Sequence, residues 1–476
     1  MSIRLPFEFL KEDGETKKLN KLLTVTEEKR NSKKFGKGNK KFGGNAAPKT
    51  VQMFKLDEDK KWIYLPFRFV RSYFSDEKYQ ERYGQYLKRR EYPKLFPDGK
   101  EGMFKGSLRP YQVPVYEEAV KYIKKERTVT LALYPSFGKT FMGALLTWKY
   151  NYWTLILVHR ETIADAWVAT FHEWTNIPKE QIIMVNDKAV RVPKKGSGKS
   201  PIENGRVFIC MYKRAMKIPK KIRKKIGFLI IDEAHTFCTA DKVESLLCVR
   251  PDKILIETAT PDRSDGMETC MHLLGGSHCI EVTNEKPFKF YFIQTGIDFN
   301  PDPNKVWTDL LKLQMESDER NDIIYRIAKR HAHIKQMFIA SRKEHCKMIK
   351  KELESEGHEC AELYGTIKKC DTKQFLVGTS SKMGTGFDEK NACKNFKGAA
   401  SQLVWLLHSF AEIEPWIQTV GRGMRHPKPK FIMLVDNTSI TKRHIRESKK
   451  WVERFNGEVV NISVKKIDEF VIPDES

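Results

Sequence analysis

The chain has 476 residues, of which 40% are hydrophobic and 31% are charged, and its formal net charge is +25 at pH 7 with an isoelectric point near 9.5. This length is greater than one hydrophobic core usually supports, so we expect two or three domains. No stretch is apolar for long enough to cross a bilayer, and residues 1–10 lack the pattern of a secretory signal peptide, so the sequence favours a soluble intracellular protein. The excess of basic residues favours a polyanionic partner, with a lysine-rich solvated surface as the alternative.

Residues 1–105 are predicted to form an N-terminal accessory domain that binds nucleic acid. Its segment 29–50 is basic and of low complexity, and no acidic residue interrupts the cations between Lys29 and Lys41. We expect this segment to be flexible and to contact phosphates. The run 61–70 has the composition of a strand, and the Tyr-, Arg- and Lys-rich stretch after it is predicted to be helical.

The rest of the chain is predicted to be an α/β protein with two tandem units. In residues 106–285 and again in residues 326–440, short apolar runs alternate with helical stretches, which is typical of a parallel sheet covered on both faces. Residues 286–325 are predicted to link the units, and residues 441–476 to form a basic tail with a helix. The predicted strands are 128–133, 155–159, 182–185, 206–212, 228–232 and 253–259 in the first unit, and 336–340, 361–364, 374–380, 403–408 and 431–436 in the second.

Two stretches end in Gly-Lys-[Ser/Thr], the close of a phosphate-binding loop: LYPSFGKT at 133–140 and PKKGSGKS at 193–200. Such a loop needs a buried strand before it and a helix after it, so that backbone N–H groups point at the phosphates. Only the first copy has an apolar strand upstream and an apolar helical stretch downstream. We therefore assign Lys139 and Thr140 to a nucleotide and interpret 193–200 as a flexible basic loop.

An acidic pair, Asp232 and Glu233, directly follows the apolar strand 228–231. Ligands bind at the carboxyl ends of strands in parallel sheets, so Asp232 can hold Mg²⁺ through water while Glu233 orients or deprotonates the attacking water. An acidic pair that caps a strand by chance is the alternative. It is disfavoured because a phosphate loop ends an earlier strand and Thr258-Ala-Thr260 ends the next one.

The second unit contains QTVGRGMR, which places Gln418, Arg422 and Arg425 within two turns of a predicted helix. Guanidinium groups stabilise charge on a transferring phosphoryl group. The alternative is a helix face paired with acids, which the flanking sequence does not supply.

These motifs follow one another over residues 107–437 in the order found in superfamily 2 helicases, which the chain resembles. The spellings LRPYQ, TAT and QTVGRGMR are similar to the branch that translocates on duplex DNA. The segment 259–276, together with LVDN at 434–437, is similar to helicases of nucleocytoplasmic large DNA viruses, including the poxvirus transcript-release helicase. The motifs are LRPYQ (108–112), SFGKT (136–140), LILVHRETIADAW (155–167), DEAH (232–235), TAT (258–260), GTSSKMGTGFD (378–388) and QTVGRGMR (418–425).

The resemblance implies two tandem RecA-like domains that use ATP and Mg²⁺. It implies that Gln112 contacts adenine, that Lys139 contacts the β- and γ-phosphates and that Thr140 contacts the metal. The phosphate loop also includes Ser136 and Gly138, where Ser136-Phe137 replaces the usual Gly-Ser, and Arg160 stands where the family has Thr but can still bind phosphate. The other implied roles are coupling for Thr258 and Thr260, nucleotide contact for Gly386 and Asp388, and a second-domain catalytic wall of Gln418, Arg422 and Arg425.

Nucleic-acid contact is also expected of Lys213 and Arg214, because they begin a second acid-free basic run at 213–225.

The leading hypothesis is a monomeric ATP-dependent DNA helicase or translocase, in viral transcription or in DNA repair or recombination. The alternatives are a duplex translocase that does not separate strands, an RNA helicase in transcript release with the transcription machinery as partner, and a binding protein with an inactive ATPase. If the protein is viral, it would act in the host cytoplasm or the virion. The nine cysteines, an odd number without a Cys-x-x-Cys pair, are interpreted as reduced thiols.

Overall fold

The computed structural model describes residues 2–28, 48–97, 102–191, 200–261, 265–284, 286–367, 369–384, 387, 389–396, 398 and 400–473. Most of the predicted basic segment 29–50, the loop 193–199, Gly386 and Asp388 lie outside these residues. The chain divides into two compact units, Met1–Leu133 with Phe137–Val282 and Tyr134–Ser136 with Thr283–Ser476. Among the described residues, no helix has both the length and the apolar character needed to cross a membrane.

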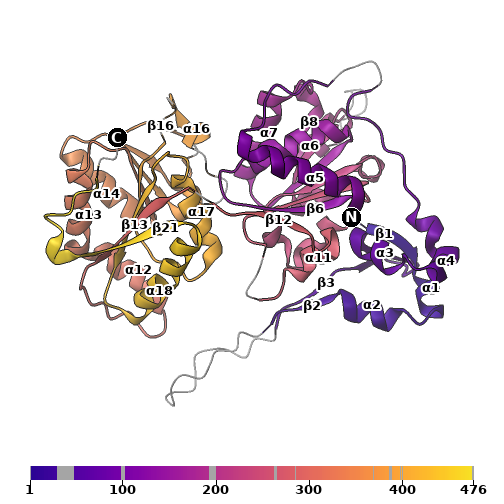
Figure 1. Ribbon diagram of the computed structural model, residues 1–476, viewed down its shortest axis with the longest axis horizontal. Helices are drawn as coiled ribbons and strands as arrows, with labels where there is room; N and C mark the ends of the chain where they lie inside the picture. Colours follow the sequence, from indigo (N-terminus) through magenta and orange to yellow (C-terminus); the bar gives the residue numbers. More distant parts are fainter. Residues whose placement is uncertain are drawn as a thin grey trace, which may run out of the picture. The chain divides into compact units, whose positions relative to one another are not determined.

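The first unit contains a sheet of seven parallel strands in the order β12-β6-β11-β10-β7-β9-β8. Helices α6 and α7 contact β10 and β9, and α11 contacts β11, so helices cover this sheet (Figure 1). The strands are β6 Thr128–Leu133, β7 Thr154–Val158, β8 Ile182–Val185, β9 Val207–Met211, β10 Phe228–Ile231, β11 Lys253–Thr258 and β12 Cys279–Val282, and the helices are α5 Val113–Glu126, α6 Lys139–Tyr150, α7 Glu161–Trp174, α8 Asp187–Val190, α9 Lys220–Arg223, α10 Val243–Leu246 and α11 Thr269–Gly275.

The N-terminal domain belongs to the same unit and has two small antiparallel pairings, β1-β5-β4 and β2-β3. The strand predicted over 61–70 is half correct, because β5 ends at Pro66 and α3 begins at Phe67. Phe67, Val70 and Phe74 are then buried at helical spacing. The elements are β1 Ser2–Pro6, α1 Phe7–Glu12, α2 Thr16–Leu23, β2 Thr24–Thr26, β3 Thr50–Gln52, β4 Lys55–Leu56, β5 Trp62–Pro66, α3 Phe67–Tyr73 and α4 Glu77–Leu87.

One hydrophobic core runs through the N-terminal domain and one face of the large sheet. It includes Leu5 and Phe74 as well as Leu157 and Ile231 from β7 and β10. The first strand is also tied to the segment before β11, because Ser2 Oγ donates to the Leu247 carbonyl at 2.6 Å. The accessory domain is therefore packed onto the first α/β domain.

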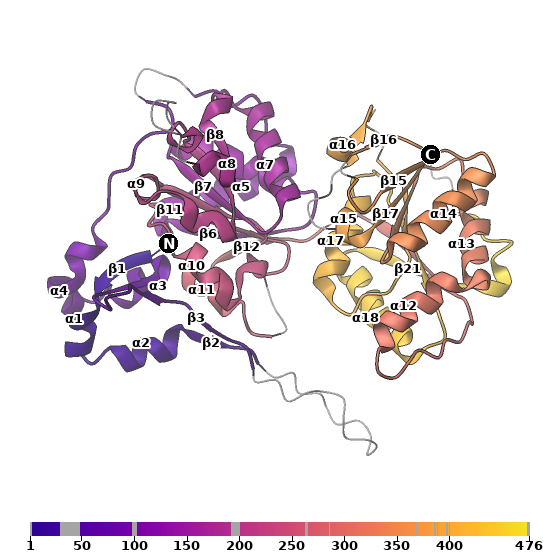
Figure 2. The ribbon, with the colours of Figure 1, turned by 180° about the vertical axis from the view of Figure 1, so that it is seen from behind.

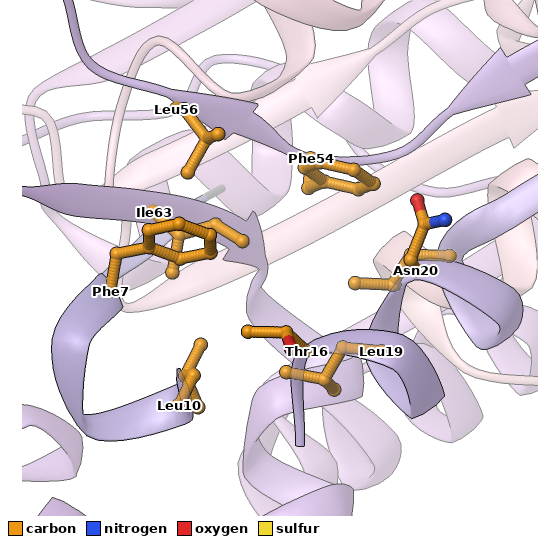
Figure 3. Close-up of a pocket in the computed structure, with 9 residues that line it drawn as sticks. Phe7, Leu10, Thr16, Leu19, Asn20, Phe54, Leu56 and Ile63 are labelled. Carbon is orange, nitrogen blue, oxygen red and sulfur yellow. The ribbon is translucent and has the colours of Figure 1, made fainter. Parts of the chain in front are cut away.

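The N-terminal domain contains a pocket of about 220 Å³ (Figure 3). Its walls are apolar apart from Thr16 and Asn20, so it offers no acid, base or cation for chemistry. The lining residues are Phe7, Leu10, Thr16, Leu19, Asn20, Leu23, Phe54, Leu56 and Ile63.

The second unit has a sheet of seven parallel strands in the order β15-β17-β14-β19-β20-β13-β21. Figure 2 shows this unit from behind, with α13 and α14 together on one side of it. A separate two-stranded parallel pairing joins β16 and β18. The strands are β13 Phe288–Gln294, β14 Gln336–Ala340, β15 Cys360–Leu363, β16 Cys370–Asp371, β17 Phe375–Thr379, β18 Cys393–Lys394, β19 Leu403–Leu406, β20 Lys430–Val435 and β21 Gly457–Ser463, and the helices are α12 Val306–Glu316, α13 Asp318–Arg330, α14 Lys343–Ser355, α15 Ser380–Met383, α16 Glu389–Ala392, α17 Ile413–Gly423 and α18 Ser439–Arg454.

Two segments contribute more to this sheet than the sequence predicts. The region 286–325, predicted as a linker, contains β13, and the tail 441–476 contains β21 after the predicted helix, which is α18. β13 pairs with β20 on one side and β21 on the other. Parallel pairing between segments so far apart in sequence leaves no local turn signal, which is why the pattern missed both strands.

Candidate active site

The loop between β6 and α6 has the geometry of a phosphate-binding loop. Gly138, just before α6, has φ +106°, and a Cβ atom there would lie 2.4 Å from Nε2 of Gln112, so the position requires glycine for both backbone and space. Lys139 is the first residue of α6, and its Nζ donates to the Leu133 carbonyl at 3.0 Å. Because the first N–H groups of a helix lack intrahelical partners, this turn can receive a phosphate.

Gln112 braces this loop from the segment before α5. Its side chain is 4% exposed, its amide donates to the Phe137 carbonyl at 2.6 Å, and its Oε1 accepts from the Arg109 backbone N–H at 2.9 Å. Phe137 is itself buried, and its ring lies 5.3 Å from that of Tyr111. The carboxamide keeps a second N–H, so the predicted adenine contact is compatible with the brace.

Ser136 occupies a backbone conformation that suits glycine. Its φ is +72°, in the left-handed region, where an L side chain costs on the order of 1 kcal/mol. The replacement of the family's glycine by serine therefore strains the loop backbone.

Asp232 lies at the end of β10 and is 5% exposed. Its Oδ2 accepts a hydrogen bond from Trp167 Nε1 at 2.8 Å. Burial, and next the charge of Glu233, raise the pKa of Asp232 to about 6, although Trp167 and Lys139 oppose this shift. A nearby cation would stabilise the charged form of this carboxyl group and lower its pKa.

Glu257, on β11, is a candidate that the sequence patterns did not identify. Its side chain is fully buried, and neither carboxyl oxygen has a hydrogen-bond partner among the described residues. Burial and then the charge of Asp232 raise its pKa well above the usual range, while Lys139 lowers it. The available signal was an acid inside the otherwise apolar strand KILIET, at a position where a buried side chain is expected.

The chemistry of these groups fits a divalent cation. Burial, and next the charge of a neighbouring carboxylate, raise the pKa of both Asp232 and Glu257, so a cation beside these groups would stabilise their charged forms. In the described part of the chain, no three His, Cys, Asp or Glu side chains are grouped as ligands of one metal ion. Mg²⁺ commonly uses one or two protein ligands and completes its shell with water and phosphates, so Asp232, with Thr140 as the other predicted ligand, would be enough to hold it.

The side chain of Glu233 is connected to the TAT segment through His235. Glu233 has φ +53°, and its Oε2 lies 3.5 Å from Nδ1 of His235, which lies 3.1 Å from Oγ1 of Thr258. Oγ1 of Thr258 also lies 3.1 Å from both the N–H and the carbonyl oxygen of Thr260. When the hydroxyl donates to that carbonyl, Nδ1 must be the donor to Thr258, so the contact fixes the histidine tautomer. A change at Glu233 can therefore reach the end of β11.

In the second unit, the two predicted nucleotide motifs meet at one backbone carbonyl. Arg422 donates to the Phe387 carbonyl at 2.7 Å, and Arg425 lies 3.4 Å from the same oxygen. Gln418 and Arg422 are one turn apart on α17, but this helix ends at Gly423, so the prediction that Arg425 belongs to it is wrong. All three side chains are half-buried.

The predicted nucleic-acid contacts differ in their surroundings. Arg160 is exposed just before α7, at the end of β7, where it can contact phosphate. Lys213 is exposed, whereas Arg214 lies 3.5 Å from Asp187, which also pairs with Lys217 at 2.7 Å. The basic run 213–225 contains no acid, but Asp187 neutralises part of its positive charge in the folded structure.

Together, the tandem parallel sheets, the geometry of the phosphate-binding loop and the ordered motifs match the arrangement of tandem RecA-like helicase domains. The family described as "Type III restriction enzyme, res subunit" matches residues 105–263. "Putative helicase 161L" of Invertebrate iridescent virus 6 is 27% identical over 395 residues, covering 75% of this chain and 83% of that protein. "Putative helicase 055L" of Frog virus 3 is 26% identical, covering 59% of this chain and 65% of that protein. The chain is similar to superfamily 2 helicases of the type found in large DNA viruses.

The fold is also found in a solved structure. Dbp5 from S. cerevisiae, bound to RNA and ADP BeF3, superposes with a TM-score of 0.52 at 14% identity, over 75% of this chain and 90% of that chain. At this identity the likeness concerns the fold, and it matches the tandem α/β architecture described above.

We expect Glu257→Gln to change how stability depends on pH. Between the usual carboxyl pKa and the raised pKa of Glu257, the folded state holds a proton that the unfolded state has released, so wild-type stability falls as pH rises through this window. Glutamine mimics the protonated group and lacks this slope. Thermal unfolding without metal or nucleotide should therefore give the variant the higher Tm at pH 7.5 and nearly equal values near pH 4. Equal Tm values at both pH values would contradict the assignment of a raised pKa.

Proposed function

We propose that the protein is an ATP-dependent motor that moves on DNA, coupling hydrolysis to translocation or strand separation. The observation that carries the proposal is the arrangement at the end of the first sheet, where Lys139 begins α6 and the carboxyl groups of Asp232 and Glu257 are both electrostatically coupled to it. Its similarity to the restriction-enzyme family and to a putative helicase of a large DNA virus supports the same function.

Each group in the first unit has a distinct task under this proposal. Lys139 and the first N–H groups of α6 bind the phosphates, and Mg²⁺ held at Asp232 and Thr140 neutralises charge on them when bound. Glu233 accepts a proton from the attacking water. Its link to Thr258 through His235 carries the change of charge to the end of β11.

The arginines of the second unit are proposed to stabilise charge on the transferring phosphoryl group. Arg422 and Arg425 are held near the carbonyl of Phe387. Because both guanidinium groups lie near the same carbonyl oxygen, their positions are fixed together. Pre-positioned cations of this kind are needed to stabilise charge on a phosphoryl group.

The proposed DNA preference rests on the sequences of the motifs, and exposed basic residues such as Arg160 and Lys213 supply charge for contacts with phosphates. The test compares ATPase stimulation and strand separation on duplex DNA, branched DNA, single-stranded DNA and RNA at one salt concentration. We expect duplex or branched DNA to stimulate hydrolysis best and RNA poorly. Equal stimulation by RNA would overturn the DNA assignment and leave the ATPase assignment intact.

A second candidate is a duplex translocase that does not separate strands. It is favoured by the match of residues 105–263 to the restriction-enzyme family. A protein with this activity would displace the third strand from a DNA triplex and would not separate the two strands of a duplex. Release of the duplexed strand in the same buffer would identify a helicase.

A further inference from the structure

Cys370 and Cys393 face each other across the β16–β18 pair of the second unit. They are direct register partners in this parallel pairing, and their Sγ atoms are 3.3 Å apart. Figure 1 and Figure 2 both show β16 beside α16, the short helix that directly precedes β18. Two thiols this close need only a small movement to form a covalent bond.

Both cysteines are held in place by contacts that do not involve their sulfur atoms. On the Cys370 side, the hydroxyl of Thr372 donates to the Lys394 carbonyl at 2.8 Å. On the Cys393 side, the buried carboxylate of Glu389 pairs with Lys335 at 2.7 Å and accepts from the Ser401 backbone N–H at 3.0 Å. The thiol pair is therefore pre-organised by its surroundings.

The two sulfur atoms differ in reactivity. Cys370 is half-buried and Cys393 is 6% exposed, so an oxidant reaches Cys370 first. The hydrogen bond between the two sulfur atoms lowers the pKa of Cys370 and raises the pKa of Cys393. Burial instead raises the pKa of Cys346 and Cys360 to about 12, which makes those thiols poor nucleophiles.

We propose that Cys370 and Cys393 form a peroxide-responsive disulfide that restrains the second-unit nucleotide motif. The two residues are 23 positions apart, so the ring that the bond closes contains the whole segment GTSSKMGTGFD at 378–388. That segment includes Phe387, whose carbonyl meets Arg422 and Arg425. Closing the ring limits the conformations of this segment.

The chemistry balances with hydrogen peroxide as the oxidant. The Cys370 thiolate attacks one peroxide oxygen, the O–O bond breaks, and hydroxide leaves and takes up a proton as water. Cys393 then attacks the sulfenic sulfur of Cys370, the S–O bond breaks, and a second water leaves. Two thiols are oxidised by two electrons, and peroxide is reduced by two.

The first test counts thiols in the full chain after treatment with equimolar hydrogen peroxide. Alkylation under denaturing conditions should fall from nine cysteines to seven, and a non-reducing peptide map should join the peptides that carry Cys370 and Cys393. Dithiothreitol should restore all nine. Cys370→Ser and Cys393→Ser should each lose the cross-link, and the matched control Cys360→Ser should keep it. Nine alkylated cysteines after peroxide, or a disulfide between another pair, would overturn the proposal.

The second test rests on the proposed function and measures nucleic-acid-stimulated ATPase. Peroxide should slow the wild type severalfold in a manner that dithiothreitol reverses, and it should leave Cys370→Ser unaffected. If the cross-linked wild type hydrolyses ATP at an unchanged rate, the claim that the disulfide restrains the motif is wrong. If the reduced protein has no ATPase activity, the proposed function fails, and the thiol count still decides whether the disulfide forms.

Discussion

Lys139→Ala should abolish nucleic-acid-stimulated ATP hydrolysis, whereas Lys199→Ala should leave turnover nearly intact. Lys139 begins α6, directly after the loop that Gln112 braces, and its amine is held at the carboxyl end of β6. The sequence just before Lys199 has no run with the composition of a strand, although this copy has the more common form of the motif. Removing a charge-stabilising donor from a phosphoryl-transfer site costs roughly 10²- to 10³-fold or more in turnover.

The measurement is steady-state ATPase with and without duplex DNA, alongside binding of a fluorescent ATP analogue. Unchanged thermal unfolding of each variant would show that the comparison concerns the site. Comparable losses in both variants would mean that the loop was assigned to the wrong copy of the motif.

Glu233→Gln should bind ATP and DNA and hydrolyse poorly. The amide keeps the size of the carboxylate and can remain near His235, and the proposed metal ligand Asp232 is untouched, but the attacking water would lose its proposed base. Loss of a general base lowers turnover by roughly 10²- to 10⁴-fold. Single-turnover hydrolysis should fall while nucleotide affinity stays near that of the wild type.

The matched control is Glu117→Gln, an exposed position on α5. It removes the same charge from the same unit and should keep wild-type turnover. A near-wild-type rate for Glu233→Gln would remove this residue from the catalytic set.

Local patterns predicted those parts of the site that depend on neighbouring sequence. Strand, loop and helix are contiguous around Lys139, so periodicity alone selected the correct context for a phosphate loop. The position of Asp232 directly after β10 was predicted for the same reason, because an acid at the end of an apolar run is visible in sequence.

Features that depend on distant contacts were not predictable. In the sequence, Glu257 is an acid in an apolar strand with no evident role. Only the fold shows that its carboxyl group interacts electrostatically with Asp232 and Lys139. In the sequence, no acid neutralises the positive charge of the basic run at 213–225. In the structure, Asp187 pairs with Lys217 and Glu203 pairs with Lys221. Likewise β13 reads as part of a linker, because its partners β20 and β21 lie more than a hundred residues away.

The shared core of the N-terminal domain and the first α/β domain determines where the chain can be cut. A fragment that starts near residue 106 would bare the sheet face that holds Leu157 and Ile231, which Leu5 and Phe74 help to enclose. Exposed apolar area of this kind promotes aggregation. The boundary between the two compact units lies instead near Val282 and Thr283. A fragment of the first unit prepared for crystallisation or labelling should therefore retain the first residues of the chain and end close to that junction.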